Sequence, residues 1–143
     1  MAITEQDERL IALLRENARF PVSELARCLN VSRTAAQARL EKLERNGVIA
    51  GYTVRLSPEI QASRVRAMVM IKLPPAKRIS IEAALSKIPH LTALYSISGA
   101  FDLVAEISSR SVENLDKVID RIGGLEGVSN TQSSVILSTK FDR

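Results

Sequence analysis

The spacing of apolar residues changes once along this chain, near residue 60, and that change limits the folds open to it. Before this point apolar residues recur every three or four positions, as in amphipathic helices; after it, alternating stretches typical of strands come between helical ones. Residues 55–64 are mostly polar and include Pro58, which favours a connector. The sequence therefore predicts an α+β protein with a helical domain in residues 1–56, a linker in 57–64 and a second domain in 65–143.

The composition excludes several classes of protein. One cysteine (Cys28) and one histidine (His90) in 143 residues exclude a disulfide framework and a multi-histidine metal site. No apolar stretch reaches the ~18 residues that a membrane-spanning helix needs, and the acidic, polar start of the chain is unlike a signal or transit peptide. No nucleophile–base pair or phosphate-binding loop is visible. We therefore expect a cytoplasmic protein that is not an enzyme, uses no cofactor or metal and binds no membrane.

The first domain is predicted to contain three helices followed by a small hairpin. Thr4 and Asp7 fit a capping box at the start of the first helix, which should end near residues 17–18. Pro21 opens a short second helix, and Ser32 is a suitable N-cap for the third. Residues 48–56 are rich in strand-forming side chains around a central glycine, so we expect a two-stranded wing there.

The second domain follows the order strand, helix, strand, strand, helix, strand. Ser80 and Ser111 are suitable N-caps for its two helices. A glycine-containing turn joins the middle two strands, as in a hairpin. This order is the split βαββαβ, or ferredoxin-like, arrangement. The expected strands are 65–73, 91–98, 101–108 and 128–139.

The second and third helices, joined by a short turn, form a helix-turn-helix pattern whose third helix has a polar outer face. Gln37 is able to pair with adenine, and Arg33 with guanine or phosphate. We expect Ser32 to suit a phosphate, Arg39 to have a phosphate or structural role, and Arg55 on the wing to reach the adjacent backbone. The alternative is an ordinary solvated helix. The predicted residues for binding double-stranded DNA are Ser32, Arg33, Thr34, Gln37, Arg39 and Arg55.

The charge and the aromatic content bear on the partner in different ways. The formal net charge of +4 indicates an acidic partner, with nucleic acid first. Aromatic residues make up 3% of the chain, which argues against binding of single strands by base stacking. The charge does not locate a DNA site, because residues 1–63 carry a net charge of +1 and residues 64–143 carry +3. The helix-turn-helix pattern therefore supports DNA binding more directly than the charge does.

Several short motifs resemble one known family. The chain contains Glu24-Leu-Ala, Val31-Ser-Arg-Thr34, Arg39-Leu-x-x-Leu43-Glu, Gly47-Val-Ile-x-Gly-Tyr52 and Ser98-Gly-Ala-Phe-Asp-Leu103. In this order they resemble the Lrp/AsnC, or feast/famine, transcriptional regulators. The resemblance implies a winged helix-turn-helix joined to a ferredoxin-like RAM domain, dimers that often assemble into octamers, and a response to amino acids. Pro21 and Glu41 depart from the family's common pattern: a Ser or Thr cap is frequent at the first position and a basic residue at the second.

The resemblance also implies an effector site between RAM domains. It maps onto the glycine hairpin, one arginine and the last strand; the residues are Gly99, Ala100, Phe101, Asp102, Arg110, Ser134, Val135 and Ile136. A glycine turn can hold an α-carboxylate with backbone N–H groups, and Asp102 can accept from an α-ammonium. The alternative for Gly99 and Asp102 is a well-formed turn, and for the last strand ordinary packing.

One face of the predicted sheet is unusually apolar for a surface in water. If both helices cover one face, the other shows Met68, Met70, Leu94 and Val104. We expect a second copy of the chain to cover these residues.

Together these features predict a sequence-specific DNA-binding transcriptional regulator that responds to a small effector, with an amino acid as the expected class. The alternative is an architectural, chromatin-like DNA-binding protein with little response to ligands.

Overall fold

The computed structural model describes residues 2–142. The chain divides into two compact units, residues 1–55 and 56–143, and each is described by itself. No helix in the described part of the chain is long and apolar enough to cross a membrane.

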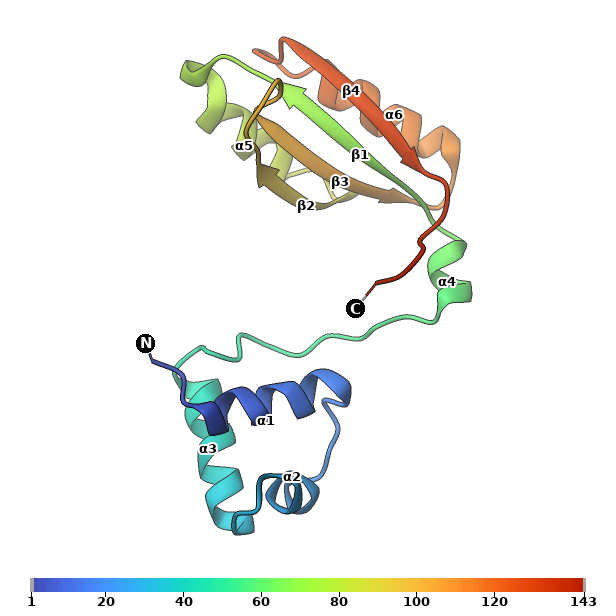
Figure 1. Ribbon diagram of the computed structural model, residues 1–143. Helices are drawn as coiled ribbons and strands as arrows, with labels where there is room; N and C mark the ends of the chain where they lie inside the picture. The colour runs from blue at the N-terminus through green and yellow to red at the C-terminus, as the bar shows by residue number, and fades with distance from the viewer. Residues whose placement is uncertain (1, 143) are drawn as a thin grey trace. The chain divides into compact units, whose positions relative to one another are not determined.

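Three helices make up the first unit: α1 (Glu5–Glu16), α2 (Val22–Leu29) and α3 (Arg33–Arg45) (Figure 1). The capping box is confirmed, because the Thr4 hydroxyl accepts from the Asp7 N–H at 3.2 Å and the Asp7 carboxylate accepts from the Thr4 N–H at 2.9 Å. One face of each helix contributes to a common core, which consists of Leu10, Leu14, Leu25, Leu29 and Leu43. Burying these leucines fixes how α2 and α3 sit against α1.

The turn between α2 and α3 is held by the backbone. Asn30 adopts the left-handed conformation, with φ 55° and ψ 47°, which asparagine tolerates better than most residues. The Val31 N–H then donates to the Ala26 carbonyl at 3.0 Å and closes the end of α2. Ser32 caps α3 as predicted: its hydroxyl accepts from the Ala35 N–H at 3.1 Å.

The prediction of a two-stranded wing in residues 48–56 is wrong. Residues 48–56 contain no strand, and 50–56 run as an extended segment that pairs with no strand in residues 2–142. Strand-forming residues alone do not make a hairpin, because two short arms without a third strand or a helix to pack on are not stable. The predicted linker is also more ordered than expected, since Ser57 caps the short helix α4 (Pro58–Ala62).

The second unit has the predicted βαββαβ order and α+β class. Four antiparallel strands form one sheet in the order β2-β3-β1-β4. Both α5 and α6 cover the same face of this sheet (Figure 1). The elements are β1 (Val65–Lys72), a 3-10 turn (Pro75–Lys77), α5 (Arg78–Ser86), β2 (Leu91–Ser96), β3 (Leu103–Ser109), α6 (Val112–Gly123) and β4 (Asn130–Ile136).

The core of this unit lies between the helices and the sheet. Alternate residues of β1 and β3 point toward the helices and are fully buried: Ala67, Val69, Ile71, Leu103, Ala105 and Ile107. The helices contribute Ile81, Leu85, Leu115 and Ile122. The period-two alternation in the sequence therefore located this core correctly.

Two expectations for this unit need correction. Helix α5 begins at Arg78 and not after Ser80, whose hydroxyl donates to the Lys77 carbonyl at 2.9 Å from inside the helix. Leu94 lies opposite Ala105 and packs into the core, so its predicted place on the open face is wrong. The register between β2 and β3 shifts between Leu91 and Ala93, which changes the face that the following residues occupy.

Candidate functional site

The outer face of α3 is the candidate DNA-binding surface. Ala36 and Leu43 are buried against the other helices, whereas Arg33, Thr34 and Gln37 are exposed. The first turn of α3 contains no acidic residue, so its backbone N–H groups and Arg33 form a positive end. A helix with this polar, positively charged start is suited to phosphates and to base edges in a major groove.

Ser32 has a local role that is compatible with phosphate binding. Its oxygen accepts from the Ala35 N–H, which stabilises the start of α3. In this cap the Ser32 oxygen is the acceptor, so the hydroxyl keeps its own proton and can donate it to a phosphate oxygen.

Arg39 is tied to the interior of the first unit. Its Nη1 atom donates to the Asp7 carboxylate at 2.6 Å and to the Thr4 hydroxyl at 3.1 Å, and its side chain is 31% exposed. The Thr4 N–H first, and then Thr4 Oγ1 and Arg39, lower the pKa of Asp7 to about 2. The structure thus gives Arg39 the structural role that was one of its two expected roles.

Gln37 has a partner on the same helix that the motif pattern did not indicate. Its Nε2 atom donates to the Glu41 Oε1 atom at 2.6 Å, and both residues are exposed. Spacing of four residues places them on one face of α3. That spacing, read together with one amide and one carboxylate, is the signal in the sequence that could have revealed the pair.

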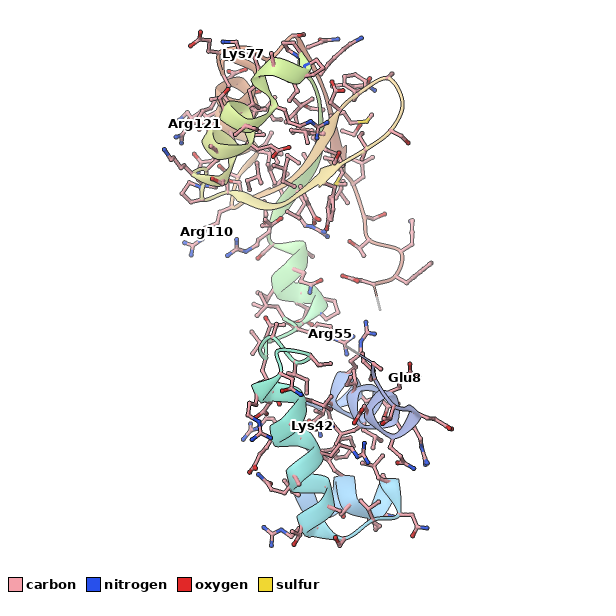
Figure 2. All side chains as sticks on the ribbon, turned by 90° about the vertical axis from the view of Figure 1, so that its left-hand side faces the viewer. Glu8, Lys42, Arg55, Lys77, Arg110 and Arg121 are labelled. Atoms are coloured by element: carbon pink, nitrogen blue, oxygen red, sulfur yellow. The ribbon has the colours of Figure 1, made fainter. Side chains whose placement is uncertain are left out.

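Basic side chains continue beyond the start of α3. Lys42 is exposed on the helix, and Arg55 is exposed in the extended segment that follows it (Figure 2). Tyr52 fastens this segment to α3, because its hydroxyl donates to the Glu44 Oε1 atom at 2.5 Å. The hydrogen bond, with some burial, raises the pKa of Tyr52 to about 12. Arg55 is therefore presented on a tethered extended segment and not on a hairpin.

The hairpin loop between β2 and β3 contains the first group of predicted effector residues. Gly99 has φ +109°, a conformation that side chains rarely adopt. Asp102 fixes the loop to the end of β1: its Oδ2 atom accepts from the Leu73 N–H and its N–H donates to the Ile71 carbonyl, both at 2.9 Å. These bonds support the turn role. They use one of the two carboxylate oxygens of Asp102, and a carboxylate can accept a hydrogen bond from a ligand at the other.

The remaining predicted effector residues lie at the other end of the sheet. Arg110 follows the last residue of β3, and its side chain points away from the sheet (Figure 2). The seven residues of β3, roughly 20 Å of extended chain, separate Arg110 from the hairpin loop. Val135 and Ile136 pair with Ala67 and Arg66 at the start of β1, which is the Arg110 end, and Ser134 pairs with Met68 nearer the middle of β1. A single chain therefore does not bring the two groups together.

The open face of the sheet carries a mixture of apolar and paired charged side chains. Met68, Met70 and Val104 are half-buried there, as expected, and an ion pair joins Arg66 to Glu106. Tyr95, opposite Val104, is 52% exposed on this face and takes the place predicted for Leu94.

Comparison with known proteins connects both units to one family. The AsnC-type helix-turn-helix domain matches residues 3–44, and the Lrp/AsnC ligand binding domain matches residues 66–143. The chain belongs to the Lrp/AsnC family of transcriptional regulators. The HTH-type transcriptional regulator LysM of Saccharolobus solfataricus is 32% identical over 140 residues, which are 97% of this chain and 96% of LysM. Members of the Lrp/AsnC family are regulators and not enzymes.

Solved structures agree with this assignment. E. coli AsnC has a TM-score of 0.88 and 26% identity, with 100% of this chain and 97% of AsnC covered. The leucine response regulatory protein LrpA of Mycobacterium tuberculosis has a TM-score of 0.81 and 30% identity, with 98% and 96% covered. A transcriptional regulator from Neisseria meningitidis, solved as a complex with L-Met, shares the fold with a TM-score of 0.88 at 23% identity, with 99% and 94% covered.

Proposed function

We propose that this chain is a sequence-specific DNA-binding regulator whose assembly or DNA binding responds to an amino acid. The observation that carries the proposal is the exposed polar face of α3, which α2 and a backbone-closed turn hold in a helix-turn-helix. In such motifs the second helix enters the major groove with its N-terminal residues toward the bases. In this chain those residues are Arg33, Thr34 and Gln37.

The DNA contacts divide into two kinds. In this proposal Ser32, the N-terminus of α3 and Arg55 contact phosphates, which supply affinity that falls as salt rises. In this proposal Thr34 and Gln37 read base edges, which supplies sequence preference. Arg39 acts indirectly, because its bond to Asp7 fixes α3 against α1.

A second copy of the chain is the proposed occupant of the open sheet face. Met68, Met70, Val104 and Tyr95 form an apolar patch on an antiparallel sheet face that would otherwise meet water. A two-fold dimer would present two copies of α3 to half-sites ~10 base pairs, or a multiple of that, apart. Dimers of this kind are proposed to assemble further, toward the octamers that the family resemblance implies.

The placement of the effector residues supports a site shared between chains. The hairpin loop at Gly99–Asp102 lies at one end of the sheet and Arg110, Val135 and Ile136 lie toward the other, so a small ligand contacts both groups only where two chains meet. The complex of the Neisseria meningitidis regulator with L-Met supports an amino acid as the ligand class. Such a ligand would act by binding one assembly state more tightly than another.

A two-step binding experiment tests this function. Selection of duplexes from a randomised pool should enrich a sequence with two half-sites, and the Gln37→Ala variant should lose preference at one position in each half-site. A thermal-shift screen of the twenty amino acids should then identify a ligand that changes the binding isotherm on the selected duplex. Equal binding to all sequences with no response to any amino acid would contradict the proposal and favour the architectural alternative.

A further inference from the structure

The hydrogen bond between Gln37 and Glu41 fixes the orientation of the Gln37 side-chain amide. The Nε2 atom of Gln37 lies 2.6 Å from the Glu41 Oε1 atom, and both side chains are on the exposed face of α3. An ionised carboxylate only accepts hydrogen bonds. Glu41 therefore holds the nitrogen end of the amide toward itself, and the opposite orientation would set two oxygens against each other.

This bond changes what Gln37 can offer to a base. A glutamine amide has two N–H donors and one carbonyl acceptor. One N–H is given to Glu41, so the edge that remains consists of one donor and one acceptor. A glutamine without such a partner can present either this mixed edge or both of its N–H donors.

The mixed edge matches one purine and not the other. In the major groove adenine presents the N7 acceptor beside the N6 amino donor, whereas guanine presents two acceptors, N7 and O6. An edge with one donor and one acceptor satisfies both groups of adenine. Against guanine the Gln37 carbonyl would face the O6 acceptor, and a buried acceptor would be left without a donor.

We propose that Glu41 is a positioning residue that restricts Gln37 to reading adenine and excludes guanine at the same position. The inference rests on the proposed function, in which α3 lies in a major groove. Glu41 is one helical turn beyond Gln37 toward the C-terminal end of α3, so it acts through the amide and needs no contact with a base.

The proposed role has a signature that a simple charge effect lacks. A carboxylate on the DNA-facing side repels phosphates, so its removal should raise affinity for every duplex. If Glu41 also orients Gln37, removal should at the same time lower the preference for adenine over guanine at one position. A charge effect alone would raise the affinity for every duplex and leave the preference for adenine over guanine unchanged.

Full-length variants separate these two effects. The position read by Gln37 is found first, as the one where Gln37→Ala loses its preference in a selection from randomised duplexes. Fluorescence anisotropy then compares two duplexes that differ there by A·T or G·C. The wild type should prefer A·T by roughly 5- to 150-fold, the range for a good bidentate pair. Glu41→Ala should bring that ratio close to 1 while binding neither duplex more weakly than the wild type does.

Two further variants serve as rescue and control. Glu41→Asp keeps a carboxylate four residues from Gln37, a spacing at which glutamine and aspartate still hydrogen-bond, so it should keep most of the wild-type ratio. Glu16→Gln removes one exposed negative charge from the last turn of α1, away from α3, and should leave the ratio unchanged. Circular dichroism spectra should be the same for all variants, because each changed side chain is exposed.

Several results would overturn the inference. A wild-type preference for guanine at the Gln37 position, or a Glu41→Ala ratio equal to that of the wild type, would show that Glu41 does not select the base. If Glu41→Asp and Glu41→Ala lowered the preference for A·T over G·C equally, the hydrogen bond between Gln37 and Glu41 would not be the cause of that preference. If Gln37→Ala selected the same DNA sequence as the wild type, Gln37 would not read a base, and Glu41 could not select one through it. A wild-type protein that enriches no sequence would overturn the proposed function, and this inference with it.

Discussion

Arg39 shows how a single residue on the recognition helix can serve the interior of its domain. The sequence predicted the capping box of Thr4 and Asp7, because that motif is local and its two members are three positions apart. It did not predict that Arg39 would join the same carboxylate, since the two residues are 32 positions apart and meet through the packing of α3 on α1. The stability of the helix-turn-helix therefore depends on a charge at the start of α1.

This arrangement predicts an acid-sensitive contribution to stability. The pKa of Asp7 falls from 3.8 to about 2 on folding, so its stabilisation is complete above about pH 5 and is lost as the pH falls through 3.8 toward 2. The shift corresponds to about 2 kcal/mol at neutral pH. In urea unfolding followed by circular dichroism, Asp7→Asn should be less stable than the wild type by about that amount at pH 7, and the difference should shrink toward pH 2.

The neighbouring carboxylate provides the control for that measurement. Glu8 lies on the same turn and is exposed, so Glu8→Gln should keep the acid dependence of the wild type. If the free energies of unfolding of Asp7→Asn and the wild type differed by the same amount from pH 7 to pH 2, ionisation of Asp7 would not stabilise the fold.

At the scale of elements, local signals predicted where helices begin better than which strands form. Ser32 and Ser111 cap α3 and α6 as expected, because a side-chain oxygen and a backbone N–H three residues later suffice. Strands need partners: residues 48–56 have strand-forming side chains, but no segment in the described part of the chain pairs with them. The single register shift before Leu94 likewise depends on pairing with β3, which alternation in one strand does not reveal.

The extended segment after α3 is predicted to be held by the phenol of Tyr52. The bond to Glu44 favours the neutral phenol and raises its pKa to about 12, so the stabilisation is present below pH 10 and is lost as the pH rises toward 12. The chain has two tyrosines, so absorbance at the tyrosinate band in a Tyr95→Phe variant reports Tyr52 alone. The pH at the midpoint of the Tyr52 titration should lie near 12, and it should fall toward 10 when Glu44→Gln is added to this variant.

A midpoint near 10 with Glu44 intact would show that the segment is not tethered in solution. Because Tyr52 is 55% exposed, we expect Tyr52→Phe to reduce global stability only slightly.

At the scale of the whole molecule, the family resemblance assigned the predicted effector residues to a site between RAM domains, and one chain separates the Gly99–Asp102 loop from Arg110 by the length of β3. The motif order carries no information about distance: β3 alone separates Asp102 from Arg110 by roughly 20 Å. Bringing such residues to one ligand requires a surface from another chain. Assembly and sensing are thus expected to be coupled, and both depend on the open sheet face.

The last prediction concerns that face. Met70 is half-buried at its centre, between Val104 on β3 and Gln132 on β4. In a two-fold dimer every contact occurs twice, so Met70→Lys would bring two unpaired ammonium groups into one apolar interface. Burial of an unpaired charge costs at least ~3 kcal/mol, which corresponds to at least ~100-fold weaker dimerisation. Sedimentation velocity should show monomers of Met70→Lys at concentrations where the wild type is dimeric.

A matched variant on the other side of the sheet tests whether the position matters. Ile79 is 84% exposed on α5, so Ile79→Lys introduces the same charge outside the proposed interface and should leave the dimer intact. Because two linked recognition helices bind two half-sites far more tightly than one, Met70→Lys should also weaken binding to a two-half-site duplex while leaving binding to a single half-site unchanged. A wild type that is monomeric at micromolar concentration, or equal effects of the two lysines, would show that this face is not where the copies meet.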